Sequence, residues 1–528
     1  MTSPLPVLAS EPRRSGAERG TLGWTRWCDP LLLGLVAVAI SGFRSWSPSF
    51  WHDEAATVSV AGRDIPDTVR LLFDVDAVHG AYYLGMHGWL RVVPLTEFWL
   101  RLPSVLAVGI GAAGLVVLGK LVSTRRVALV AALVFAILPR VTSAGIEARS
   151  YALSAALAVW VTVVFVVAVR RRTGTAWVLY ALLVAVSTTV FLYSILIVAA
   201  HVVTLAVTKT GRRCVGSFVL AAGAGIAIAA PVIVLVQSQA DQVSWIAGRN
   251  FDLVWIVLVE QYFDNTLPVA VVSGLLVVAG VTVGIVRERD RRDGDHAGLL
   301  ATAVPWLVVP TALVLLYSLT SQNVYLGRYF TFTAPACALL LGQSMVWIAG
   351  LAGRRSLPLL AVILALFGAI ALPHYLVQRG PYAKPSGMDY SRVADLVESE
   401  AGPGDCVLYD LKNVWNPGPM RTVETVDPPA FAALRDISRG STAAELGELW
   451  DETLAPDRIA DQIRSCPAIW LLTDRSAGVD SHTGAAVDSR DPVALGANFR
   501  VVRSYDFDVD ERWQLNVSQV VHFVRRGT

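Results

Sequence analysis

Hydrophobic positions form long, nearly uninterrupted runs between residues 30 and 375. Examples are "LPSVLAVGIGAAGLVVLGKLV", "YALSAALAVWVTVVFVVAV" and "AVVSGLLVVAGVTVGIV". A helix of about 20 apolar residues is long enough to cross a bilayer. A helix buried in a soluble core explains one such run but not a series, so the pattern predicts a polytopic α-helical membrane protein surrounded by membrane lipids.

The runs predict eleven transmembrane helices, with ten or twelve as alternatives. We place them at 30–47, 99–121, 127–144, 150–169, 176–191, 193–208, 217–236, 268–286, 299–318, 329–350 and 356–375. The composition agrees with this class, because only 16% of the 528 residues are charged, against about 25% in soluble domains.

Basic loops fall on alternate sides of this arrangement. "KLVSTRR", "RRRTGT", "TKTGRRC" and "RERDRRDGD" all come on the same side as residues 1–29, which are polar and contain several arginines. Cytoplasmic loops are enriched in Lys and Arg. We therefore expect residues 1–29 to be a disordered cytoplasmic tail without a cleavable signal peptide. The outer loop 48–98 and the C-terminus then lie outside the plasma membrane.

Residues 376–528 are polar and predict a separate extracytoplasmic α/β domain after the transmembrane domain 30–375. "DCVLYD" and "AIWLLTD" are typical of buried strands, and "NFRVVRSYDFD" with "QLNVSQVVHFVRR" of a closing antiparallel pair. Residues 376–528 have neither the G-x-G-x-x-G nor the phosphate-loop fingerprint, and we expect no nucleic-acid partner. Cys406 and Cys466 form a disulfide in an oxidising compartment or remain two buried free thiols.

Two adjacent acids, Asp53 and Glu54, follow the first predicted helix on the outer side, with Trp46 and Trp51 close by. Trp is enriched at membrane interfaces. A partly desolvated carboxylate has a raised pKa and can accept a proton from a substrate hydroxyl. Asp53 and Glu54 are therefore catalytic candidates, the alternative being that they lie among lipid headgroups without a role in catalysis.

A second outer turn, "SAGIEARSYAL", brings a carboxylate, an arginine and a tyrosine together. Glu147 is a candidate second carboxylate and Tyr151 a candidate substrate contact. Arg149 can hold a phosphate through two parallel hydrogen bonds, with help from Arg140 just upstream. The alternative is a local ion pair between Glu147 and Arg149.

Arg328, in "SQNVYLGRYFTFTAP", lies at the outer start of a predicted helix. An arginine at membrane depth is costly and marks a functional site by default. We take Arg328 as a second phosphate-binding candidate, with snorkelling to the headgroups as the alternative.

No metal site follows from the spacing of the histidines. His52, His79 and His87 match no familiar zinc pattern. A divalent metal held by Asp53, Glu54 and Glu147 remains open, and no other cofactor is indicated.

Together these pieces resemble the GT-C superfamily of membrane glycosyltransferases. The nearest relatives are the bacterial protein mannosyltransferases and aminoarabinose transferases, in their actinobacterial branch. "WHDEAATVSVAGR", "YYLGMHGWL", "EFWLRLPSVL" and "EARSYAL" occur in that order within residues 50–155. The resemblance gives candidate substrate-binding roles to His79, Tyr82 and Tyr83. Relatives commonly carry His-Pro-Pro shortly before the paired tyrosines, whereas both prolines are missing here.

The resemblance implies transfer of a sugar from a polyprenyl-phosphate donor, with inversion, on the outer membrane face. The sugar would be mannose, with arabinofuranose or galactose as alternatives, and the acceptor a cell-envelope glycan, lipid or protein. It also ranks Asp53 above Glu54 as the base. The lack of a nucleotide fingerprint in residues 376–528 is consistent with a lipid-linked donor, because an outer enzyme cannot draw on cytosolic nucleotide sugars.

Two other functions compete with a glycosyltransferase. A transporter or flippase needs polar residues near the bilayer midplane, but the predicted helices carry their ionisable residues at the outer ends. A non-enzymatic binder of lipid-linked sugars is the second rival, although it has no need of paired carboxylates.

Overall fold

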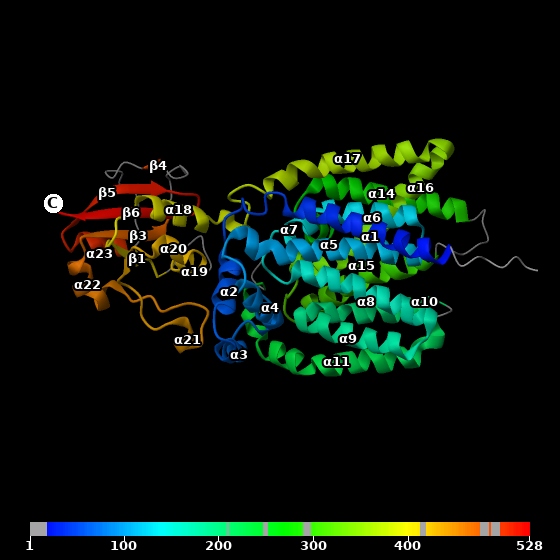
Figure 1. The fold of residues 1–528 in the computed structure, drawn as a ribbon, viewed down its shortest axis with the longest axis horizontal. Coiled ribbons are helices and arrows are strands. Elements are labelled where there is room, and N and C mark those ends of the chain that lie inside the picture. The colour runs from blue at the N-terminus through cyan, green and yellow to red at the C-terminus, as the bar shows by residue number, and fades with distance from the viewer. Residues whose placement is uncertain are drawn as a thin grey trace, which may run out of the picture.

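The computed structural model describes residues 18–208, 211–246, 252–288, 297–411, 419–475, 485–486 and 497–527. A helical bundle occupies one half of the molecule and a sheet domain the other, with short helices between them (Figure 1). Of the expected disordered tail, residues 1–17 lie outside the described residues. Residues 18–29 are not disordered but belong to the first helix, α1.

Eleven apolar helices of the described chain overlap the eleven ranges predicted from the hydrophobic runs. They are α1 (Glu18–Gly42), α5 (Glu97–Val122), α6 (Arg125–Ile137), α8 (Tyr151–Arg171), α9 (Gly174–Val190), α10 (Leu196–Val207), α11 (Val215–Ser238), α14 (Leu267–Glu288), α15 (Ala297–Thr320), α16 (Ala334–Ala349) and α17 (Ser356–Val377). Within the described residues, six helical segments are long and apolar enough to cross a membrane. The chain is therefore a multi-pass membrane protein, while the number of spans stays a prediction.

Three predicted helices are broken, and proline explains one break. The predicted helix 127–144 ends as α6 at Ile137 and restarts as α7 (Pro139–Ala144), because proline cannot donate a backbone hydrogen bond within a helix. The predicted helices 193–208 and 329–350 begin as the 3₁₀ helices η2 (Leu192–Ile195) and η6 (Gly327–Thr333), before α10 and α16. Helix α7 lies at the end of the bundle nearest the sheet domain (Figure 1), and η6 contacts both α7 and η2.

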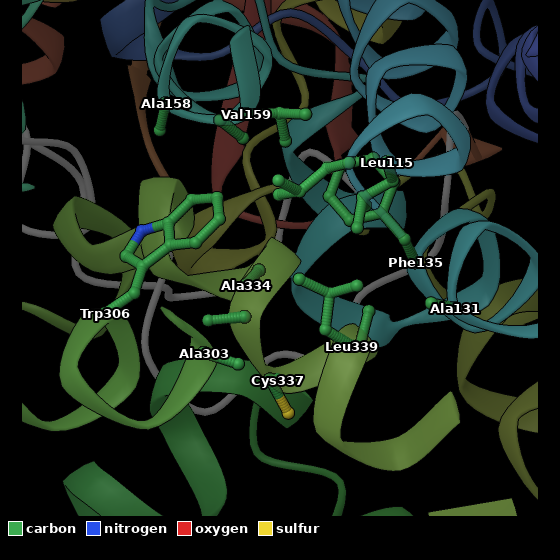
Figure 2. Close-up of a cluster of buried hydrophobic side chains, with 14 of the residues drawn as sticks. Leu115, Ala131, Phe135, Ala158, Val159, Ala303, Trp306, Ala334, Cys337 and Leu339 are labelled. Atoms are coloured by element: carbon green, nitrogen blue, oxygen red, sulfur yellow. The ribbon is translucent and has the colours of Figure 1, made fainter. Parts of the chain in front are cut away.

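The bundle core is built from small and aliphatic side chains. Figure 2 shows Leu115, Phe135 and Leu339 meeting beneath Val159, with Trp306 on the other side. These side chains are fully buried or nearly so. Small residues let helix backbones approach closely: a Cβ added at Gly119 would lie 2.6 Å from the Cα of Ala128. The core therefore fixes the helix positions that carry the site.

The outer loop 48–98 folds into short helices between the bundle and the sheet domain (Figure 1). They are α2 (His52–Ala61), α3 (Ile65–Asp74), the 3₁₀ helix η1 (Ala77–His79) and α4 (Gly80–Leu90). The segment between α11 and α14 contributes four more short helices. They are η4 (Ala240–Ile246), α12 (Leu253–Trp255), η5 (Ile256–Glu260) and α13 (Gln261–Phe263).

The C-terminal domain contains a six-stranded mixed sheet in the order β2-β1-β3-β6-β5-β4. Its strands are β1 (Cys406–Tyr409), β2 (Arg435–Asp436), β3 (Ala468–Asp474), β4 (Ala485–Ala486), β5 (Phe507–Gln514) and β6 (Ser518–Arg525). The longest helices are α18 (Tyr390–Glu400), α23 (Ala497–Arg503) and α22 (Ala460–Ser465). Strand β1 is parallel to β2 and β3, and β6 is antiparallel to β3 and β5.

One predicted strand of this domain is wrong in its first half. The stretch "NFRVVR" lies in helix α23, and the strand of the closing pair starts only at Phe507. The side chains of Phe499 and Val502 are buried three residues apart, which is the spacing of one helix face.

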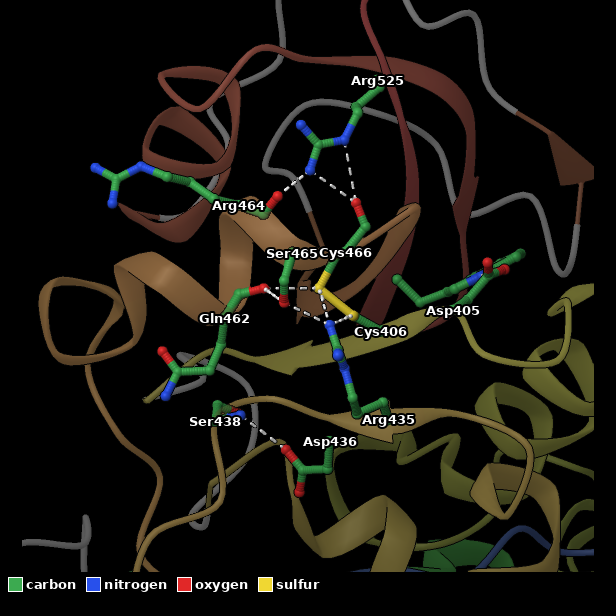
Figure 3. Close-up of a disulfide and its surroundings, with 11 residues drawn as sticks. Asp405, Cys406, Arg435, Asp436, Ser438, Gln462, Arg464, Ser465, Cys466 and Arg525 are labelled. Carbon is green, nitrogen blue, oxygen red and sulfur yellow. Dashed lines mark hydrogen bonds between the residues drawn. A yellow bond between two sulfur atoms is a disulfide. The ribbon is translucent and has the colours of Figure 1, made fainter. Parts of the chain in front are cut away.

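A disulfide joins Cys406 on β1 to Cys466 just before β3 (Figure 3). Cys406 and Cys466 are therefore disulfide-bonded and are not two free thiols. The guanidinium of Arg435 lies 3.2 Å and 3.4 Å from the two sulfurs. The bridge ties together neighbouring strands separated by 60 residues of chain, and it fits an oxidising compartment.

The C-terminal domain and the outer loop share one hydrophobic core. Trp51 and Tyr83 of the outer loop belong to the same cluster as Met388, Tyr390 and Trp513 of the C-terminal domain. The domain is therefore seated directly on α2 and α4, against the end of the bundle that holds the candidate catalytic residues.

Candidate active site

A cavity of about 730 Å³ opens at the end of the bundle nearest the C-terminal domain. Its charged side chains come from α2, the turns before η1 and α8, and η6. Most of its apolar side chains come from α10, α11 and α15, and Gln237, Gln239 and Gln242 add polar groups at the end of α11 and in η4. The lining includes His52, Asp53, Asp76, His79, Arg149, Tyr151, Arg328 and Tyr329, and also Leu196, Ile233, Val236, Leu313, Val314 and Leu449.

Helix α2 explains why the two adjacent acids have different surroundings. It begins at His52 after an extended Trp51, so Asp53 and Glu54 both lie in its first turn, where the helix dipole favours negative charge. Successive side chains on a helix are about 100° apart. Asp53 consequently lines the cavity, whereas Glu54 is fully buried on another side of the helix.

Asp53 lies between two arginines at the charged end of the cavity. Its Oδ1 is 3.6 Å from Nη2 of Arg149, and its Oδ2 is 3.4 Å from Nη2 of Arg328. Burial raises the pKa of Asp53, but the two guanidiniums outweigh burial and hold the pKa below its usual range. The carboxylate is therefore ionised, and both contacts are ion pairs longer than a hydrogen bond.

Asp76 is the second carboxylate of the cavity, and the sequence reasoning missed it. Its Oδ2 is 3.5 Å from Nη1 of Arg149 and accepts a hydrogen bond from the Tyr83 hydroxyl, which in turn accepts one from Arg149. Asp76 has a positive φ of 61°, a conformation that Asp adopts more readily than most residues. The sequence signal that could have identified Asp76 is its position three residues before His79, which is itself a candidate site residue. We call Asp53, Asp76, Arg149 and Arg328 the cavity cluster.

Glu54 belongs to a separate buried group. Arg101 donates from Nε to Oε1 at 2.8 Å and from Nη2 to Oε2 at 2.6 Å, and both side chains are fully buried. The backbone N–H of Ala148 donates to Oε1 at 3.1 Å, and Lys384 Nζ lies 3.4 Å from it. We call Glu54, Arg101 and Lys384 the anchor cluster. Both carboxylate oxygens of Glu54 are engaged in these contacts. Glu54 therefore has no oxygen left for a ligand, whereas Asp53 lines the cavity.

Glu147 does not line the cavity either. It lies buried in the turn before α8, and its Oε1 has no hydrogen-bond partner among the described residues. Burial raises its pKa, against the opposing effect of Lys384 and Arg328. Asp76, and not Glu147, therefore provides the carboxylate that accompanies Asp53 in the cavity.

The aromatic candidates also include residues that line the cavity and residues that do not. Tyr151 lines the cavity, and His79 beside it has its Nδ1 3.3 Å from the Ser150 hydroxyl. Burial and the charge of Arg149 lower the pKa of His79 to about 4, so this imidazole is neutral at pH 7. Tyr82 is buried in the core shared with the C-terminal domain and does not line the cavity.

Arg140 is not available to a phosphate in this cavity, contrary to the expectation from the sequence. Its Nη1 lies 2.9 Å from Oδ1 of Asp264, and it donates to the carbonyls of Gln261 at 3.2 Å and Glu260 at 2.7 Å. Through these contacts, Arg140 joins the segment between α11 and α14 to α7.

The three acids considered as metal ligands do not converge. The Asp53 oxygens lie against arginines, both Glu54 oxygens contact Arg101 or Lys384, and Glu147 stands apart from the cavity. In the described part of the chain, no group of three or more His, Cys, Asp or Glu is placed to hold a metal ion. Asp53, Glu54 and Glu147 therefore do not fit as one ligand set.

The fold is that of a known group of membrane glycosyltransferases. ArnT from Cupriavidus metallidurans in its apo state superposes with a TM-score of 0.54 at 12% identity, over 95% of this chain and 98% of ArnT. The same enzyme bound to undecaprenyl phosphate gives 0.55 at 14% identity over the same shares. The arabinofuranosyltransferase AftD from Mycobacteria gives 0.45 at 17% identity, over 94% of this chain and 40% of AftD.

Sequence comparison adds nothing to this result. No protein-family profile matches the chain, and no curated protein sequence matches it. The predicted likeness to the GT-C superfamily is confirmed at the level of the fold.

Proposed function

We propose that this chain is a GT-C glycosyltransferase that uses a polyprenyl-phosphate sugar donor on the outer membrane face. The acceptor hydroxyl attacks the anomeric carbon, the bond from that carbon to the phosphate oxygen breaks, and the configuration inverts. The hydroxyl proton passes to the carboxylate of Asp53, and polyprenyl phosphate leaves. Mannose is the first sugar to test, with arabinofuranose and galactose as alternatives.

The observation that carries the proposal is the position of Asp53 between two arginines in a cavity that also has aliphatic side chains in its lining. Arg149 and Arg328 can bind a donor phosphate bidentately. Their contacts to Asp53, at 3.6 Å and 3.4 Å, are long enough for phosphate oxygens to replace. The donor would thus release Asp53 from its ion pairs and leave it ready to accept a proton.

The apolar part of the cavity suits the prenyl chain of the donor. Ile233 and Val236 of α11 and Leu313 and Val314 of α15 all line the cavity. These aliphatic side chains would pack against an isoprenoid chain, while Arg149 and Arg328 would hold its phosphate. The solved complex of ArnT with undecaprenyl phosphate supports the same class of donor here.

The orientation rests on charge and on the disulfide. The C-terminal domain and α2–α4 lie at the same end of the bundle (Figure 1). Helices α5 and α8 begin near the cavity, so the basic loops "KLVSTRR" and "RRRTGT" after them lie at the other end of the bundle, which the positive-inside rule assigns to the cytoplasm. The disulfide between Cys406 and Cys466 favours an extracytoplasmic location for the sheet domain.

The remaining candidates receive supporting roles. Glu54 positions the start of α2 through Arg101, so that Asp53 faces the cavity. Neutral His79, Tyr83 and Tyr151 would contact the sugar or hold Arg149 in place. Glu147 and Tyr82 would stabilise the adjoining turn and core.

The test is transfer by the full-length protein reconstituted in lipid. Polyprenyl-phospho-mannose, -arabinofuranose and -galactose are each offered with glycan, lipid and peptide acceptors. General-base help is worth about 10²–10⁴-fold in rate, so Asp53→Asn should lower kcat by at least about 100-fold while still binding undecaprenyl phosphate. Asp67→Asn, which removes an acid from the exposed part of α3, is the matched control. No transfer from any of the three donors by the wild type would refute the proposal.

A further inference from the structure

A loop of the C-terminal domain reaches the catalytic cavity. Residues 440–452, which we call the docking loop, include the short helix α21 (Ala443–Leu446). Figure 1 shows α21 extending from the sheet domain toward α2 and α3. The side chain of Leu449 in this loop lines the same cavity as His52 and Asp53.

The docking loop is held in shape by its own hydrogen bonds. The N–H of Gly440 donates to the carbonyl of Glu452 at 2.9 Å, and the N–H of Ala443 donates to Oδ1 of Asp451 at 2.8 Å. Thr442 and Glu445 form a reciprocal capping box at the start of α21. Gly447 ends α21 with φ of 68°, a conformation that glycine adopts without strain. The loop is therefore preformed before any ligand enters.

Helix α2, which carries Asp53, also holds the docking loop. Arg63, which follows α2 and is buried, donates from Nη1 to the carbonyl of Ala443 at 3.4 Å and from Nη2 to the carbonyl of Glu448. The Ser59 hydroxyl donates to the carbonyl of Leu449 at 2.5 Å. Among the described residues, Arg63 makes no ion pair within 4.0 Å, so its guanidinium is spent on the carbonyls of this loop and on Ser59. Asp53 and Leu449 are thus fixed relative to each other through one helix.

The wall that the loop contributes is apolar and uncharged. Leu449 is followed by Trp450, whose ring lies 5.2 Å from the ring of His52. Burial lowers the pKa of His52, which keeps this imidazole neutral at pH 7. The charged groups nearby in the loop are acids, the exposed Glu448 and the partly buried Asp451. Apolar and aromatic lining with few polar groups is typical of sites for small organic ligands.

We propose that the docking loop forms the acceptor subsite, in which Leu449, and His52 held in place by the Trp450 ring, contact an uncharged sugar ring whose hydroxyl faces Asp53. The proposal rests on the proposed function and names the class of acceptor. The arginines of the cavity cluster are taken by the donor phosphate, Asp451 pairs with Arg439 at 3.6 Å, and the cavity lining then leaves no unpaired cation for an anionic acceptor among the residues described here. The acceptor is therefore a neutral glycan.

The test compares acceptor use in Leu449→Ala, Trp450→Ala and Arg63→Gln with Leu446→Ala. Leu446 lies on the same loop but is 45% exposed and outside the cavity lining, which makes it the matched control. The full-length protein in lipid is assayed for transfer to methyl glycosides, for release of sugar to water, and for binding of undecaprenyl phosphate. The three variants should raise the acceptor KM by about 10-fold or more. Release of sugar to water and binding of undecaprenyl phosphate should change less than the acceptor KM in these variants, and all readouts of Leu446→Ala should stay at wild-type values.

Binding of the acceptor alone separates this proposal from the proposed function. Saturation-transfer NMR with methyl α-mannopyranoside, methyl glucuronide and a neutral tripeptide needs no turnover. Loss of the methyl α-mannopyranoside signal in Leu449→Ala would support the subsite even if no donor were active. An unchanged acceptor KM in all three variants, or preferred binding of the glucuronide or the peptide, would overturn it.

Discussion

The cavity cluster and the anchor cluster contain the same kinds of ions and each takes one acid from α2, but their geometries differ. In the anchor cluster, Arg101 meets Glu54 at 2.6 Å and 2.8 Å, and both side chains are fully buried. In the cavity cluster, the three ion pairs span 3.4 to 3.6 Å. The Nε atoms of Arg149 and Arg328 have no hydrogen-bond partner among the described residues.

The difference shows how the fold separates stability from chemistry. A fully satisfied buried ion pair is costly to break but has no capacity left for a ligand. A loosely paired cluster with free donors can exchange its internal partners for a phosphate. One turn of α2 supplies an acid to each cluster, so the first cluster fixes the helix on which the second depends.

Breaking the anchor cluster should have the largest effect on stability. Arg101→Met leaves Glu54 buried with only Lys384 and one backbone N–H, and loss of one partner of a buried pair costs about 3–5 kcal/mol. We expect low yield and a clearly lower Tm, measured by thermal unfolding in detergent. Arg149→Met, the corresponding change in the cavity cluster, should unfold within a few degrees of the wild type. Equal Tm losses in both variants would contradict the division of the two clusters.

Lys384 allows the anchor cluster to be examined through pH. Burial lowers its pKa to about 8, in spite of the nearby Glu54, whereas an unfolded lysine titrates near 10.4. Between these values the unfolded chain binds more protons than the folded chain, so stability rises with pH by up to ~1.4 kcal/mol per unit.

The matching experiment is chemical unfolding at several pH values between 7 and 11. Wild-type stability should rise through the window from about pH 8 to 10.4 relative to Lys384→Met, in which that contribution is absent. Parallel pH curves for the two proteins would mean that Lys384 is not held in this way.

Features that depend on neighbouring residues could be predicted from the sequence, whereas features that depend on residues distant in the chain could not. The apolar helices follow from local hydrophobic runs, and Asp53, Arg149 and Arg328 were found because arginines and acids at a membrane edge are unusual. Only the family resemblance ranked Asp53 above Glu54, because the residues around them were not predicted to form a helix with neighbouring side chains about 100° apart.

The other differences come from partners that are distant in sequence. Arg140 was taken for a phosphate ligand because its partner Asp264 lies on another outer segment. Asp76 is brought to Arg149 by a turn with positive φ, and Leu449 reaches the cavity from the other end of the chain. Local pattern carries no signal for such pairings.

The cavity cluster can be examined by changing the shape of a cation without changing its charge. Arg328→Lys keeps a positive charge near Asp53 but removes the planar pair of donors that suits a phosphate. A hydrogen bond to a charged group is worth about 1.5–3 kcal/mol, so losing one should weaken undecaprenyl phosphate binding by roughly 10-fold or more. Tm should stay unchanged, because the contact of Arg328 to Asp53 is already 3.4 Å long.

Arg149→Lys should weaken binding similarly, whereas Arg140→Lys, outside the cavity, should leave lipid affinity at the wild-type value. If Arg328→Lys and Arg149→Lys both bind the lipid as tightly as the wild type, these arginines do not hold the donor phosphate, and the loose geometry of the cavity cluster needs another explanation.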